Sequence, residues 1–128
     1  MRVPVTPCDS CPYRRRHPSG VWHESEYAKL RKYDDNTATG LFLCHQSTAA
    51  KEELVCRGWL TVHCESVAAR LAVLRGQLTV QQLYAKVRVA LFKTGAEAAE
   101  HGIARLKKPG RAAKQMAAKL YRRRIAKR

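Results

Sequence analysis

Four cysteines in the first half of this chain place the strongest constraint on how it can fold. They follow the pattern C-x2-C-x32-C-x11-C, at Cys8, Cys11, Cys44 and Cys56. The thiols of Cys8 and Cys11 can turn toward one cation, because a tight turn separates them and its amide hydrogens stabilise thiolate charge. The other two cysteines arrive singly, so three separate segments have to meet if all four bind one metal centre.

Two kinds of metal centre suit this spacing. A zinc ribbon usually closes with a second C-x2-C or H-x3-5-H pair, which this chain lacks. One C-x2-C pair with two distant cysteines looks more like [4Fe-4S] proteins such as the cluster-bearing uracil-DNA glycosylases, and Pro12 after Cys11 is typical of ferredoxin-type motifs. We therefore expect a [4Fe-4S] cluster on the four cysteines. The alternative is Zn²⁺ bound by Cys8, Cys11 and Cys44, with Cys56, His45 or His63 as the fourth ligand.

A third interpretation needs no metal, because free cysteines are often buried and several can share one small core. Against it, the four cysteines stand among arginine, histidine and turn residues. Cys64 is expected to be a buried or half-exposed thiol, or else a replacement ligand beside His63. If residues around Cys44 form a strand, His45 points the other way and donates to a ligand instead of binding the metal.

The length and the cysteine count bound the class of protein. A chain of 128 residues is one ordinary domain that can bury an apolar core. No apolar run is long enough for a signal peptide or a membrane span, so we expect a cytoplasmic protein without a membrane partner. Five cysteines, an odd number, in a reducing compartment favour metal binding or free thiols over disulfides.

Positive charge is concentrated in the second half of the chain. Residues 1–64 carry 9 Lys and Arg against 7 Asp and Glu, whereas residues 65–128 carry 16 against 3. After Glu100 there is no acidic residue, and 11 basic residues follow. Such a one-signed segment is typical of proteins that bind polyanions, most often nucleic acid.

The patterns predict a mainly α-helical fold with a loop-rich N-terminal half. Residues 1–64 are expected to hold the metal site, at most short strands and one helix at 24–33, which has acidic residues at its start. Residues 65–128 are expected to form three to four helices. The two halves together are expected to form one compact domain with an extended C-terminal helix. The expected helices lie at 66–75, 79–92, 94–102 and 110–128.

Local signals place the ends of these helices. Thr79 and Thr94 are each followed three residues later by Gln or Glu, the spacing of an N-terminal capping box. Gly76 and Gly102 are expected to stop the first and the third helix. The apolar residues of 79–92 recur at helical spacing, which predicts a core-facing amphipathic helix.

Several motifs resemble a family of small uncharacterised cysteine-rich proteins from high-GC bacteria and their phages. They are CPYR at 11–14, PSGVW at 18–22, FLCHQ at 42–46, CRGW at 56–59 and GAEAAEHG at 95–102. The resemblance implies that Cys8, Cys11, Cys44 and Cys56 are the matching cysteines. The family pattern commonly has an acidic residue at the position of Arg16, and Cys64 is not part of it. The resemblance implies no activity.

The leading hypothesis is a phage or bacterial regulatory or DNA-transaction accessory protein that binds an iron-sulfur cluster or zinc. Nucleic acid, DNA or RNA, would bind along the C-terminal helix. The alternatives are a metal-stabilised adaptor for a host protein such as a polymerase or ribosomal component, and a redox sensor. Because no catalytic motif is present, we do not expect an enzyme. The expected phosphate contacts are Arg111, Lys114, Lys119, Arg122, Arg123, Arg124, Lys127 and Arg128.

Overall fold

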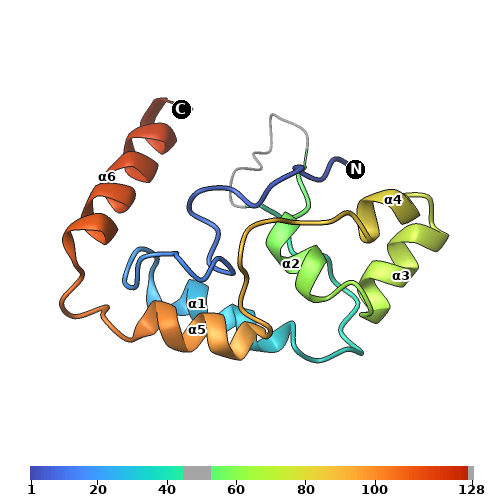
Figure 1. Ribbon diagram of the computed structural model, residues 1–128, viewed down its shortest axis with the longest axis horizontal. Helices are drawn as coiled ribbons and strands as arrows, with labels where there is room; N and C mark the ends of the chain where they lie inside the picture. The colour runs from blue at the N-terminus through green and yellow to red at the C-terminus, as the bar shows by residue number, and fades with distance from the viewer. Residues whose placement is uncertain (45–52, 127–128) are drawn as a thin grey trace.

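The protein is mainly helical, and its N-terminal half is rich in loops (Figure 1). The computed structural model describes residues 1–44 and 53–126. In these residues, extended segments pair only through isolated bridges, at Arg2–Leu54, Arg14–Leu91 and Leu43–Val55. The helices are α1 (Glu24–Lys32), α2 (Arg57–Val62), α3 (Val67–Leu74), α4 (Val80–Leu83), α5 (Gly95–Ile103) and α6 (Arg111–Ala126).

Helices α1 and α5 form the most extensive helix–helix contact of the described residues (Figure 1). Two glycines of α5, seven residues apart and therefore on one face, allow it. A Cβ added at Gly95 would overlap the carbonyl of Leu30, and one added at Gly102 would overlap the ring of Tyr27. The backbone of α5 therefore lies directly on α1, closer than side chains would permit.

Gly102 therefore has a different role from the one predicted. It lies inside α5, which continues to Ile103, so the prediction that it stops the helix is wrong. The physical reason is the contact with Tyr27, which needs a residue without a side chain. Gly76, in contrast, has φ +74° directly after Arg75, the C-cap of α3, which confirms the predicted left-handed stop.

The P-S-G-V-W turn connects to both of these helices. Gly20 has φ +90°, and its N–H donates to the carbonyl of Gly102 at 2.9 Å. The backbone N–H of Trp22 donates to the hydroxyl of Tyr27 at 3.1 Å. On the same hydroxyl, His17 Nε2 makes a buried hydrogen bond of 2.7 Å. The turn is thus held by the α1–α5 pair, which fixes the C-terminal end of the segment that carries Cys8 and Cys11.

The predicted helix at 79–92 is wrong beyond its first turn. Only α4 forms there, with the predicted capping box between Thr79 and Gln82, and the chain then runs extended toward α5 (Figure 1). The alternation of exposed cations with partly buried Val87 and Val89 also fits extended backbone, because β-branched residues at every second position suit it. The N–H of Phe92 donates to the carbonyl of Tyr13 at 2.8 Å, which fixes this extended path.

The core lies where α2 packs on the N-terminal turns and on α1. The segment before α2 makes an isolated bridge at Val55, and the helix, which the sequence did not predict, begins at Arg57. Rings of Tyr33 and Phe42 pack edge to face 5.0 Å apart beside it. The largest fully buried side chains are those of Trp59, Tyr13, Tyr27, Leu30 and Leu60.

Helix α6 stands at the edge of the molecule, away from the other helices (Figure 1). Ala113, on its inner face, is 2% exposed, and the more distal Tyr121 is 66% exposed. The loops of the N-terminal half lie beside it in place of another helix. No helix in the part of the chain that the structure describes has the length and the apolar character needed to cross a membrane.

We predict that Gly102→Ala destabilises the protein by about 1–3 kcal/mol, the usual cost of overpacking. In an exposed helix the same change would stabilise by up to about 1 kcal/mol, so the loss must come from the clash with Tyr27. Gly40→Ala is the matched control, since a Cβ there meets no atom within 4 Å. Urea unfolding of both variants measures the difference, and equal stabilities would contradict the close α1–α5 contact.

Candidate metal centre and nucleic-acid interface

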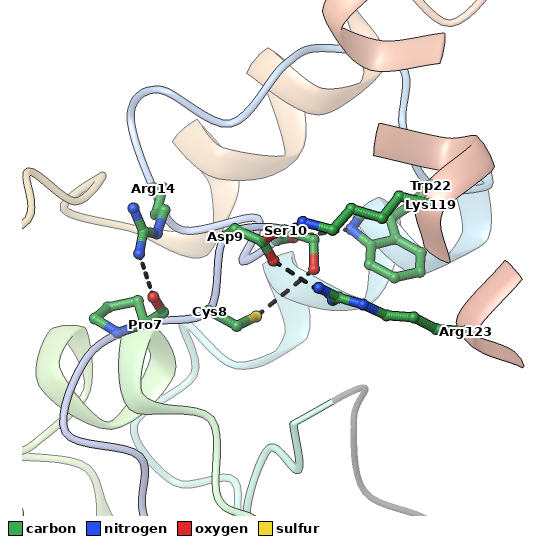
Figure 2. A network of polar contacts seen from close by, with 8 residues as sticks. All are labelled: Pro7, Cys8, Asp9, Ser10, Arg14, Trp22, Lys119 and Arg123. Atoms are coloured by element: carbon green, nitrogen blue, oxygen red, sulfur yellow. Dashed lines mark hydrogen bonds and ion pairs between the residues drawn. The ribbon is translucent and has the colours of Figure 1, made fainter. Parts of the chain in front are cut away.

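Residues Cys8–Cys11, called the knuckle below, form a tight turn (Figure 2). The N–H of Cys11 donates to the carbonyl of Cys8 at 3.0 Å, which closes the turn. Trp22 Nε1 donates to the carbonyl of Ser10 at 3.2 Å, and the guanidinium of Arg14 donates to the carbonyl of Pro7. Two side chains from the segment that follows the knuckle therefore hold its backbone in place.

The thiols of Cys11 and Cys56 meet in the core. Their Sγ atoms are 3.9 Å apart, and the two residues are 1% and 5% exposed. Cys56 precedes α2, and its Sγ accepts a hydrogen bond from the N–H of Trp59 at 3.5 Å. A Cβ at Gly58 would lie 2.6 Å from the sulfur of Cys11, so the first turn of α2 leaves room for that sulfur. The C-R-G-W motif thus brings a second cysteine segment to the knuckle.

Cys44 is the third buried thiol of this region. A short antiparallel contact brings its segment beside that of Cys56: the N–H of Cys44 donates to the carbonyl of Leu54 at 2.6 Å, and that of Cys56 to Phe42 at 2.9 Å. The pKa of the Cys56 thiol is raised well above its usual value, first by its contact with Cys11, then by burial, and to a lesser degree by the charge of Cys44. Cys44 therefore lies within electrostatic reach of the Cys11–Cys56 pair.

The structure does not bring all four predicted ligands to one point. Cys8 is half-buried, and its Sγ lies 3.7 Å from the hydroxyl of Ser10 (Figure 2). Among residues 1–44 and 53–126, no three side chains of His, Cys, Asp or Glu are arranged to hold a metal ion. His45 lies outside the described residues. Binding of one centre by all four cysteines thus stays a prediction, and their sulfur-only chemistry suits zinc and iron-sulfur centres alike.

His63 has a partner other than the cysteines. Its Nε2 lies 3.4 Å from Oδ1 of Asp34, whose two carboxylate oxygens accept hydrogen bonds from the N–H groups of Gly95 and Ala96 at 2.6 and 2.9 Å. Burial lowers the pKa of His63, and the negative charge of Asp34 partly offsets this effect. His63 therefore belongs to the contact between the end of α2 and the start of α5. Cys64, half-buried, lines a separate surface hollow.

A buried arginine next to Cys56 was not anticipated. Arg57 is 3% exposed, and it donates to the carbonyl of Pro4 at 2.9 Å and to that of Gln82 at 2.8 Å. Burial lowers its pKa, whereas the neighbouring Cys56 raises it. It places a positive charge beside the thiols, where it can offset the negative charge of thiolates. The only sign of this burial in the sequence is that Arg57 directly follows the predicted ligand Cys56 and precedes an apolar run.

The knuckle is joined to α6 by ion pairs. Oδ2 of Asp9 lies 2.9 Å from Nζ of Lys119, and Oδ1 lies 3.7 Å from Nη1 of Arg123 (Figure 2). All three side chains are about half exposed. The hydrogen bond from Lys119 and the nearby positive charges lower the pKa of Asp9. Asp9 was not singled out from the sequence, because it was one of two spacer residues between cysteines.

The other cations of α6 point away from the body of the protein. At helical spacing Arg111, Lys114 and Arg122 fall within an arc of about 80°, on the side opposite the buried Ala113. These three cations have no ion-pair partner within the part of the chain that the structure describes. The side chain of Arg124 and the residues Lys127 and Arg128 lie outside the described structure.

Comparisons with known proteins give one match. Searches of curated proteins and of solved structures each found none. A family model of unknown function matches residues 3–124 and so covers the cysteine segments, the α1–α5 pair and nearly all of α6. The chain therefore belongs to the family of unknown function DUF6283.

Proposed function

We propose that this protein binds a metal centre through Cys8, Cys11, Cys44 and Cys56, and that the centre positions α6 for binding nucleic acid. The observation that carries the proposal is the pairing of Asp9 with Lys119 and Arg123. Asp9 lies between two of the proposed ligands, so the conformation of the knuckle and the position of the basic helix are linked.

The contact of Cys11 with Cys56 supports a metal centre built from thiolates. In a tetrahedral zinc site with Zn–S bonds of about 2.3 Å, two sulfurs lie about 3.8 Å apart. The Sγ–Sγ distance of 3.9 Å is close to this value. In a [4Fe-4S] cube each cysteine binds a different iron, which requires the sulfurs to lie farther apart. The distance therefore favours zinc. A [4Fe-4S] cluster is the alternative, and elemental analysis of the purified protein distinguishes the two.

The main effect of such a centre would be to order the irregular segments that carry its ligands. Residues 1–23 contain no regular element, and the three cysteine segments pack against one another through single hydrogen bonds and isolated bridges. Structural zinc supplies apparent binding energies on the order of 10 kcal/mol, enough to fix loops of this kind. The nearby charge of Arg57 would offset part of the negative charge of the thiolates.

The nucleic-acid part of the proposal rests on charge and exposure. The chain carries a net charge of +15, and α6 presents Arg111, Lys114 and Arg122 on its outer face. Exposed cations along a helix bind phosphates by releasing condensed counterions, which gives affinity with little dependence on base sequence and a strong dependence on salt. The position of α6 at the edge of the molecule leaves this face accessible (Figure 1).

We expect freshly purified protein, prepared without oxygen, to contain one metal centre per chain. Elemental analysis should find about one zinc per colourless chain, or, for the cluster, about four irons with broad visible absorption. Cys11→Ser and Cys56→Ser should lose the metal because each removes a thiolate, whereas Cys64→Ser, the matched control, should keep it. A metal-free wild type, or equal loss in all three variants, would contradict the proposed centre.

We predict that Lys114→Gln combined with Arg122→Gln weakens binding to duplex DNA. Loss of two phosphate contacts should reduce the slope of log affinity against log salt by about 1.8. The control combines Arg31→Gln with Lys32→Gln, two exposed cations on α1, and so removes the same charge elsewhere. Fluorescence anisotropy with a labelled duplex over a salt series measures both. Identical slopes for the two double variants would refute binding through α6.

We further predict that Asp9→Asn weakens binding to the same duplex. The substitution removes the two ion pairs that join the knuckle to α6, so the metal-binding turn no longer fixes the position of the helix and affinity should fall several-fold. Exposed ion pairs contribute about 0–1 kcal/mol, so the fold should persist. Glu24→Gln, which removes one exposed acidic charge from α1, controls for net charge. Stronger binding by Asp9→Asn, with its metal content unchanged, would show that Asp9 competes with phosphates for Lys119 and Arg123, and would contradict its role in positioning α6.

A further inference from the structure

A surface hollow of about 610 Å³ lies at the end of the molecule remote from α6, between α2, α4 and the extended segment after α4. Figure 1 shows α4 and α6 at opposite ends of the view. The hollow combines an exposed aromatic ring with two cations, whereas its remaining lining is apolar or small. Its lining residues are Thr61, Cys64, Leu83, Tyr84, Ala85, Lys86, Val87 and Arg88.

The ring of Tyr84 is anchored at one end and exposed over much of its surface. The residue is 56% exposed, although a tyrosine of a small core would ordinarily be more deeply packed. Its hydroxyl donates to Oε1 of Glu65 at 3.3 Å. The other oxygen of Glu65 pairs with Arg70 at 2.5 Å, so the nearest carboxylate already has a cation. A fixed, exposed ring without an uncompensated negative charge beside it is suited to stacking.

The two cations line the same hollow as this ring. They lie in residues 85–88, which follow α4 and form neither helix nor turn. Lys86 and Arg88 are exposed, whereas Val87 and Val89 between and after them are partly buried. Neither cation has an ion-pair partner among the described residues. Their charges are therefore available to an anionic ligand in the hollow.

We propose that this hollow binds single-stranded nucleic acid, with a base stacked on Tyr84 and neighbouring phosphates on Lys86 and Arg88. Aromatic platforms beside backbone-tracking cations are the usual means of binding single strands, because every base has a face that can stack. A duplex offers no unstacked base, so the preference for single strands comes from Tyr84. The inference rests on the proposed function for the class of partner, and it adds a second contact separate from α6.

The test uses a labelled single-stranded oligothymidylate and fluorescence anisotropy over a salt series. Tyr84→Leu should weaken binding about tenfold, the typical loss for one stacked base, whereas Tyr84→Phe should bind like the wild type. Lys86→Gln combined with Arg88→Gln should reduce the salt slope by about 1.4, corresponding to two phosphates on a single strand. The Arg31→Gln with Lys32→Gln variant is again the charge control. Circular dichroism confirms that each variant is folded.

The outcomes separate this inference from the proposed function. If Tyr84→Leu and the Lys86, Arg88 double variant bind the single strand like the control while the α6 variant loses duplex binding, the hollow is not a site and the proposed function stands. If the hollow variants lose single-strand binding while the α6 variant binds duplex like its control, the hollow is a binding site and the proposed binding of nucleic acid through α6 is wrong. Equal effects of Tyr84→Leu on the single strand and on the duplex would overturn the stacking of an unpaired base.

Discussion

The backbone of residues 7–22 has no regular structure, so its polar groups need partners from other segments. Those partners come from nearly every part of the molecule. The carbonyl of Tyr13 accepts from the extended segment before α5, Gly20 donates to the end of α5, and the thiol of Cys11 meets Cys56 at the start of α2. Asp9 pairs with α6. This irregular segment connects the helices, and their arrangement depends on its conformation.

That dependence gives the cysteines their significance. A loop fixed only by scattered single hydrogen bonds loses little energy when it moves, whereas a loop fixed by several metal–sulfur bonds is costly to displace. The proposed centre would therefore stabilise more than its own ligands. It would fix the knuckle, and through Asp9 the cations Lys119 and Arg123 of the helix beside it. We expect metal binding and polyanion binding to be linked through this short path.

Much of the helical structure followed from local sequence patterns. Acidic residues at the start of α1, the capping box at the start of α4 and the left-handed Gly76 after α3 act within one or two turns, and the structure has them as predicted. At α5 the Thr94 side chain caps the helix by accepting from the N–H of Glu97. The segment after α4 is the informative exception. Its apolar residues fit a helical period and, from Lys86 onward, also a period of two. The partners offered by Tyr13 and Arg15 selected the extended form, and no local pattern contains them.

The sequence by itself determined where α1, α3, α5 and α6 form, the concentration of positive charge in the second half and the spacing of the cysteines, because composition and short-range periodicity specify these. Only the tertiary structure decided which residues meet across long stretches of chain. It placed Cys11 against Cys56, buried Arg57 beside them, brought Asp9 to α6, and made Gly102 a contact surface for Tyr27 instead of a helix end. The physical reason is that these pairings depend on the path of irregular backbone, which carries no repeating pattern and is fixed by packing and hydrogen bonds from distant segments.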